Sequence, residues 1–102
     1  MLSKPVGNTG LYALTTSTGT VNITTLLSGP SWDTTALPAR KVRVAVTSPA
    51  VINFGTEVAN NNSDLLMPAN TVEHFSLNNT STVSYVLLTG ASAGYISITP
   101  VA

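Results

Sequence analysis

Hydrophobic and polar residues alternate along most of this chain, and glycine, proline and asparagine interrupt the alternation at short intervals. The clearest run spans residues 41–48, where Val42, Val44 and Val46 occupy every second position. Because successive side chains of a strand point to opposite faces, this run predicts a strand with one buried and one exposed face. No window of a dozen residues shows the spacing of a helix.

The alternation and its interruptions together predict eight short strands. We expect them at residues 11–16, 20–27, 41–48, 50–54, 65–67, 72–77, 82–89 and 94–101. Short strands separated by frequent turns are typical of two packed antiparallel sheets. We therefore predict an all-β, single-domain antiparallel β-sandwich with jelly-roll-like connectivity, and an immunoglobulin-like connectivity is the alternative.

The chain has 102 residues, the size of one domain. Residues 1–10 are polar and contain Pro5, Gly7 and Gly10, and they are interpreted as a flexible N-terminal arm. Residues 11–102 form the sandwich domain in this interpretation. Deletion of the arm is expected to leave the fold intact and to weaken assembly.

Charge is scarce in this sequence. Charged residues make up 8% of the chain and the net charge is zero, whereas a typical soluble domain has about 25% charged residues. Four Lys and Arg against four Asp and Glu do not supply the basic surface that nucleic acid requires. A surface with so few charges is poorly protected against self-association, so we expect partners or copies of the chain to cover part of it.

The first 20 residues lack the pattern of a secretory signal, and no stretch approaches the roughly 20 apolar residues of a membrane span. The expectation is a protein made in the cytoplasm without a membrane partner. The chain has no cysteine, which excludes disulfides and thiolate metal sites.

Groups able to perform catalysis are few. His74 is the only histidine, and its neighbour Glu73 is expected on the opposite face of the same strand. The remaining carboxylates, Asp33, Glu57 and Asp64, lie on other segments. Residues 60–64 offer oxygen ligands for calcium without a spaced acidic motif, which favours an ordinary loop. We therefore expect neither an enzyme nor a bound metal or cofactor.

Candidate residues for contact with a partner come from three places in the sequence. Arg40 and Arg43 belong to a short basic cluster at the start of one strand, and Trp32 lies in a proline-containing loop. Such residues anchor many protein interfaces. Together with two residues of the arm, the candidate interface residues are Leu2, Lys4, Trp32, Arg40 and Arg43.

The central and C-terminal stretches carry a resemblance to a known group of proteins. They comprise residues 42–46, 51–56, 66–75 and 94–99, with the segment Met-Pro-Ala-Asn-Thr at residues 67–71. This arrangement resembles the small β-sandwich virion proteins of tailed bacteriophages that decorate or cement capsids, over about residues 40–102. The resemblance implies a structural protein on the outer surface of the phage head that binds the major capsid protein and stabilises contacts between shell subunits. It also implies a homo-oligomer, with a trimer favoured.

Two other functions fit the same sequence. One is a carbohydrate-binding or host-adhesion module, which would need an aromatic platform or a calcium-bound loop. The other is a minor structural protein elsewhere in a virion, in the head–tail joint, the tail or a fibre.

Overall fold

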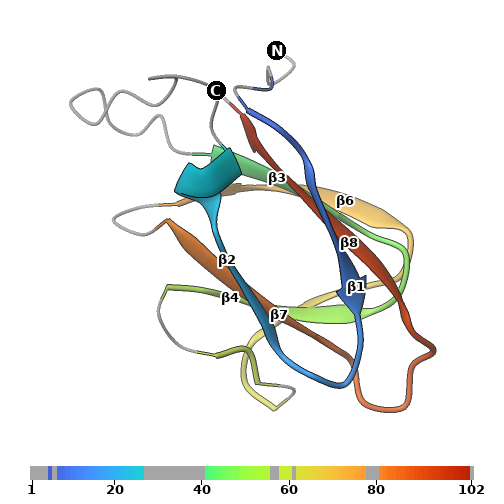
Figure 1. Ribbon diagram of the computed structural model, residues 1–102. Helices are drawn as coiled ribbons and strands as arrows, with labels where there is room; N and C mark the ends of the chain where they lie inside the picture. The colour runs from blue at the N-terminus through green and yellow to red at the C-terminus, as the bar shows by residue number, and fades with distance from the viewer. Residues whose placement is uncertain are drawn as a thin grey trace.

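The computed structural model describes Pro5 and residues 7–26, 41–55, 58–60, 62–77 and 81–101. These residues form eight strands and one short 3-10 helix, η1 (Figure 1). The elements are β1 (Gly10–Leu14), β2 (Gly19–Asn22), η1 (Ile23–Leu26), β3 (Lys41–Val46), β4 (Ala50–Phe54), β5 (Leu65–Met67), β6 (Thr71–Ser76), β7 (Thr82–Leu87) and β8 (Gly94–Val101). No helix in this described part of the chain has the length and hydrophobicity needed to cross a membrane.

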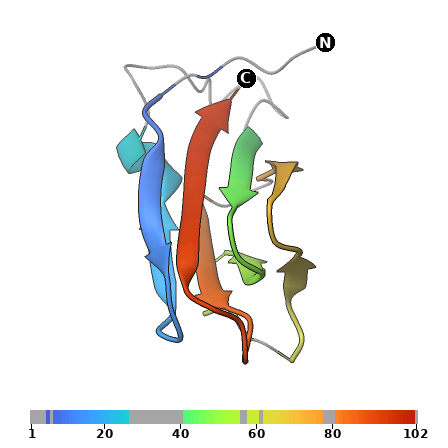
Figure 2. The same cartoon turned by 90° about the vertical axis from the view of Figure 1, so that its right-hand side faces the viewer.

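The strands form two four-stranded sheets packed face to face. The first sheet has the order β1-β8-β3-β6, and Figure 2 shows β8 (red) between β1 (blue) and β3 (green). The second sheet has the order β2-β7-β4-β5, and all neighbouring strands are antiparallel. The chain crosses between the sheets at every connection except β4 to β5. This strand order confirms the predicted sandwich and its jelly-roll connectivity rather than the immunoglobulin-like alternative.

The alternation of the sequence produces the core directly. Val42, Val44 and Val46 of β3 are buried between the sheets, as are Ile96 and Ile98 of the adjacent strand β8. The second sheet contributes the inward-facing residues of β4 and β7. The predicted bounds of β4, β5 and β8 are confirmed, and the other strands differ from the predicted bounds at their ends.

The second predicted strand, residues 20–27, is correct only in its first half. It ends at Asn22, and the chain turns into η1. The Asn22 Oδ1 atom accepts hydrogen bonds from the backbone N–H of Thr24 at 3.1 Å and from its hydroxyl at 2.7 Å. An asparagine side chain that bonds the backbone two residues ahead competes with strand pairing and starts a turn. Ile23 and Thr24 continue the apolar–polar alternation of the strand, so the sequence predicted a longer strand where the chain forms a helical turn.

An aromatic pair lies between the sheets toward each open side of the sandwich. Tyr12 of β1 stacks on Tyr85 of β7 with ring centroids 5.8 Å apart. Phe54 of β4 packs against Phe75 of β6 at 4.8 Å. Each pair joins one sheet to the other, so the apolar core extends toward both sides of the sandwich.

The predicted N-terminal arm includes residues that contact the sandwich. Gly10 is the first residue of β1, and Thr9 shares a hydrogen bond of 2.7 Å with Thr99 between their hydroxyls. The backbone N–H of Asn8 donates to the Leu26 carbonyl at 2.7 Å. Pro5 forms an isolated bridge with Val101. The remaining arm residues, 1–4 and 6, lie outside the described residues.

Candidate interaction surface

Of the five residues that the sequence suggested for a partner interface, the structure describes Arg43. Leu2, Lys4, Trp32 and Arg40 lie outside the described residues. Arg43 lies in the middle of β3, on the face of the first sheet that points away from the core. We call this surface the outer face, and it is formed by the outward residues of β1, β8, β3 and β6.

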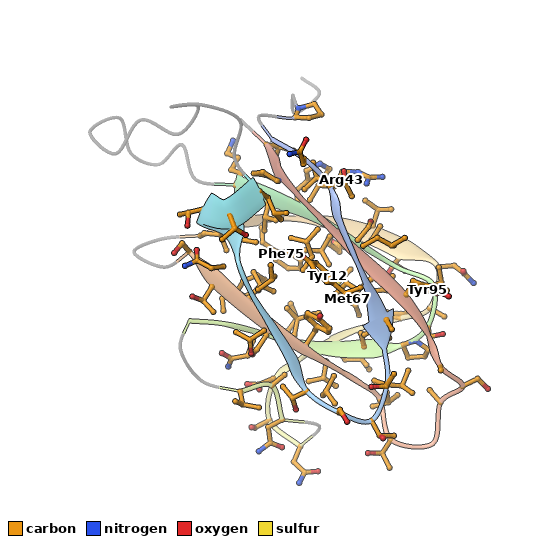
Figure 3. The ribbon with its side chains drawn as sticks, in the orientation of Figure 1. Tyr12, Arg43, Met67, Phe75 and Tyr95 are labelled. Carbon is orange, nitrogen blue, oxygen red and sulfur yellow. The ribbon has the colours of Figure 1, made fainter. Side chains whose placement is uncertain are left out.

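The strand register arranges the outer face in rows that cross the sheet. One row is basic and polar, and it joins Thr99, Arg43 and His74 in neighbouring strands. The next row is mainly apolar and contains Leu11, Ser97, Ala45 and Val72. Figure 3 shows Arg43 and Tyr95 toward opposite ends of the first sheet, whereas Met67 lies between the sheets. The outer face therefore changes from basic to apolar along the strands.

The apolar end of the outer face contains a hollow of about 340 Å³. Its floor includes Ala45 and Ser97, whose small side chains leave room between larger neighbours. Leu11, Tyr95 and Val72 line the hollow and are 67%, 56% and 46% exposed. A hollow lined by exposed apolar side chains is typical of a site that receives a side chain from a partner.

The second sheet does not present an equivalent open surface over its centre. Its outward residues Val51 and Val86 are buried, and they cluster with Ala59 and Leu88. Ala59 belongs to the loop that follows β4, so this loop covers the sheet. The two sheets thus differ at their centres: Val51 and Val86 of the second sheet are buried under the loop, whereas its edge residue Leu66 is 49% exposed.

A carboxylate holds the covering loop in place. Asp64 accepts a hydrogen bond from the Asn53 side-chain amide at 3.0 Å through one oxygen and from the backbone N–H of Asn60 at 2.7 Å through the other. The backbone N–H of Asp64 in turn donates to the Asn60 carbonyl at 3.2 Å. Both oxygens of the Asp64 carboxylate therefore accept hydrogen bonds from the protein. Asp64 belongs to residues 60–64, the segment whose oxygens were weighed above as calcium ligands.

Charge is distributed unevenly over the described residues. Lys41 and Arg43, the basic residues among them, both lie on the outer face, where His74 joins them. The described acidic residues are elsewhere: Asp64 lies in the covering loop, and Glu73 points to the inner side of β6, opposite Val44. The charges that the described residues place on the outer face are therefore positive, which suits a partner surface that contains carboxylates.

The register also separates the groups that could act in proton transfer. Glu73 and His74 are adjacent in β6 and face opposite sides of the sheet, because their cross-strand partners are the inward Val44 and the outward Arg43. Within the described ranges, no group of three or more His, Asp or Glu side chains could hold a metal ion.

Sequence reasoning placed Tyr95 on the outward face of its strand but did not select it, Leu11 or Val72 as interface residues. The sequence did contain an indication of this surface. In these strands the residues that face the core are apolar, and an additional apolar residue occupies a position that faces outward. Leu11 shows it most clearly, because Leu14 and Tyr12 of the same strand already supply the core.

Comparisons of the chain with protein-family models, with curated proteins and with solved structures find no significant match.

Proposed function

We propose that this chain is a structural virion protein, a capsid decoration or cement protein that binds the outer surface of a phage head. The observation that carries the proposal is the outer face of the first sheet, which exposes an apolar hollow next to the row of Arg43 while the covering loop buries the centre of the second sheet. The resemblance of residues 40–102 to such proteins supports the same function.

The mechanism is adhesion and requires no catalytic group or cofactor. The hollow receives an apolar side chain of the major capsid protein, Arg43 binds a carboxylate beside it, and Lys41 binds one farther along the strand. Burial of the exposed apolar surface supplies the favourable free energy, and the charges fix the orientation. Many copies on a repeating shell add such contacts into a large total stabilisation.

A second candidate function rests on Tyr95. Its ring is 56% exposed and borders the hollow together with the polar residues Asn70 and Thr47. An exposed ring beside hydrogen-bonding groups can stack on a sugar, as a carbohydrate-binding or host-adhesion module would require. Glycan-array binding that is lost in Tyr95→Ala would favour this function over decoration.

Quantitative mass spectrometry of purified virus particles tests the proposal. The expected result is a copy number comparable to that of the major shell protein. A few copies per particle would instead place the protein in the neck, tail or fibres. Its absence from particles would contradict a structural virion role.

A further inference from the structure

The two open sides of the sandwich differ in how their edge strands are protected. In a jelly roll of this order, β1 and β6 are the edges of the first sheet, and β2 and β5 are the edges of the second. An edge strand has backbone N–H and C=O groups without strand partners, so it can pair with a strand of another chain unless something prevents this.

The side formed by β5 and β6 carries several features that discourage such pairing. Glu73 is an exposed charge on the inward side of β6, where an added strand would have to bury it. β5 has three residues and is followed by Pro68, which has no N–H to donate. Short edges, inward charges and proline are the devices by which natural sheets avoid edge-to-edge association.

The side formed by β1 and β2 lacks the charge and the proline, although β2 is also short, with four residues. β1 reads Gly-Leu-Tyr-Ala-Leu and β2 reads Gly-Thr-Val-Asn, with no charged residue and no proline. Leu11 of β1 is 67% exposed, the largest value among the exposed large hydrophobic side chains of the described residues. A five-residue apolar edge of this kind favours strand addition.

We propose that two copies of this chain associate through β1, which pairs antiparallel with β1 of the second copy about a two-fold axis at Tyr12. The occupant that fits the edge is a second copy because the β1 sequence is complementary to itself in this register. Leu11 lies opposite Ala13 of the second copy, and Gly10 lies opposite Leu14 of the second copy. Leu11 therefore meets a small side chain in each half of the pair, the two Tyr12 residues meet at the axis, and no charge is buried.

The pairing preserves the faces of the sheet. A two-fold axis perpendicular to the sheet keeps inward residues on the inward side, so the two first sheets join into one eight-stranded sheet. The two outer faces then lie side by side, and Leu11 is shielded by the neighbouring copy. The low charge of the whole chain, 8% with no net charge, offers little electrostatic resistance to this association.

The inference goes beyond the proposed function and does not depend on it, since it concerns the free protein. It also predicts a two-fold association, whereas the resemblance implies a three-fold one. Measurements without virus particles therefore test it separately from the binding to a shell.

The first test compares edge variants by sedimentation velocity over a range of concentrations. The chain should sediment with twice its mass of 10.5 kDa, and Ala13→Lys should shift it to the mass of one chain. Val72→Lys, on the same face but on the protected edge β6, is the matched control and should retain the dimer. A wild-type mass of one or three chains would overturn the proposal, as would an Ala13→Lys dimer.

The second test uses the absence of cysteine and does not rely on a disruptive substitution. Leu11→Cys and Ala13→Cys are prepared as separate proteins, mixed and gently oxidised. The register predicts a covalent heterodimer between the two variants, because residues 11 and 13 lie opposite each other across the axis. Disulfide formation no faster in the mixture than in either variant alone would contradict this register and overturn the proposal.

Discussion

At the scale of single residues, glycines determine where the large rings of this sandwich can lie. Gly19 is paired with Tyr85 across β2 and β7, and the ring of Tyr85 occupies the space that a Cβ atom at Gly19 would need. Gly10 makes room in the same way for Tyr12, which stacks on Tyr85. An aromatic ring over a glycine in a neighbouring strand also shields the exposed backbone.

Gly19→Ala should therefore destabilise the protein by about 1–3 kcal/mol, the usual range for overpacking a filled site. Tyr85 is only 7% exposed, so its ring has little room to move away. Chemical denaturation measures the change in the free energy of unfolding. The same substitution in a Tyr85→Leu background should cost less, and an equal cost in both backgrounds would show that the ring is not the cause.

Tyr85 also gives the stability a dependence on alkaline pH. Burial of its hydroxyl, and secondarily the neighbouring Tyr12, raises the pKa of Tyr85 above the ordinary value of 10.0. The unfolded chain then loses this proton at lower pH than the folded chain. The stability that the protonated Tyr85 contributes to the folded state is fully present below about pH 10. It is lost as the pH rises through the raised pKa of Tyr85 in the folded state.

The free energy of unfolding should accordingly fall above about pH 10, and Tyr85→Phe should make this fall shallower. Denaturant titrations at a series of pH values measure it. The wild type titrated in parallel is the reference. If the free energy of unfolding depends on pH in the same way for the wild type and Tyr85→Phe, Tyr85 is not the group responsible for the fall.

At the scale of the elements, alternation was sufficient to predict the strands but not the structures that side-chain hydrogen bonds create. β3 and β8 follow from valine and isoleucine at every second position. η1 does not, because its first turn depends on an Asn22 side chain that bonds the backbone. The outer face escaped prediction for another reason: which apolar side chains stay exposed depends on which sheet the covering loop packs against, and this is a tertiary property.

The loop that covers the second sheet provides a test at this scale. Asp64→Asn replaces one carboxylate oxygen by an NH₂ group. That group then faces either the side-chain amide of Asn53 or the backbone N–H of Asn60, and each of these is itself a donor. We expect a loss of about 1–2 kcal/mol, the cost of one hydrogen bond to a charged group at a partly exposed site. Thermal unfolding measures it, with Ser63→Ala as the control. Equal melting temperatures for Asp64→Asn and the wild type would show that the carboxylate does not hold the loop.

At the scale of the whole molecule, the two sheets of the jelly roll differ in how their outward surfaces are covered. The covering loop buries Val51 and Val86 at the centre of the second sheet and leaves Leu66 of its edge strand half exposed, while the first sheet exposes Leu11, Val72 and Tyr95 around a hollow. Arg43, which the sequence did suggest, lies on this same surface. A face that combines exposed apolar side chains with basic ones is suited to attachment, and the proposed role as a decoration protein assigns that face to the shell.

The most direct test measures binding to virus particles that lack this protein. Ala45→Arg fills the hollow from its floor, and Thr20→Arg, exposed on the second sheet, adds the same side chain elsewhere. Both variants should melt like the wild type. Ala45→Arg should bind at least about tenfold more weakly, a difference of about 1.4 kcal/mol, while Thr20→Arg binds normally. Wild-type binding by Ala45→Arg, or equal losses in both variants, would contradict attachment through the outer face.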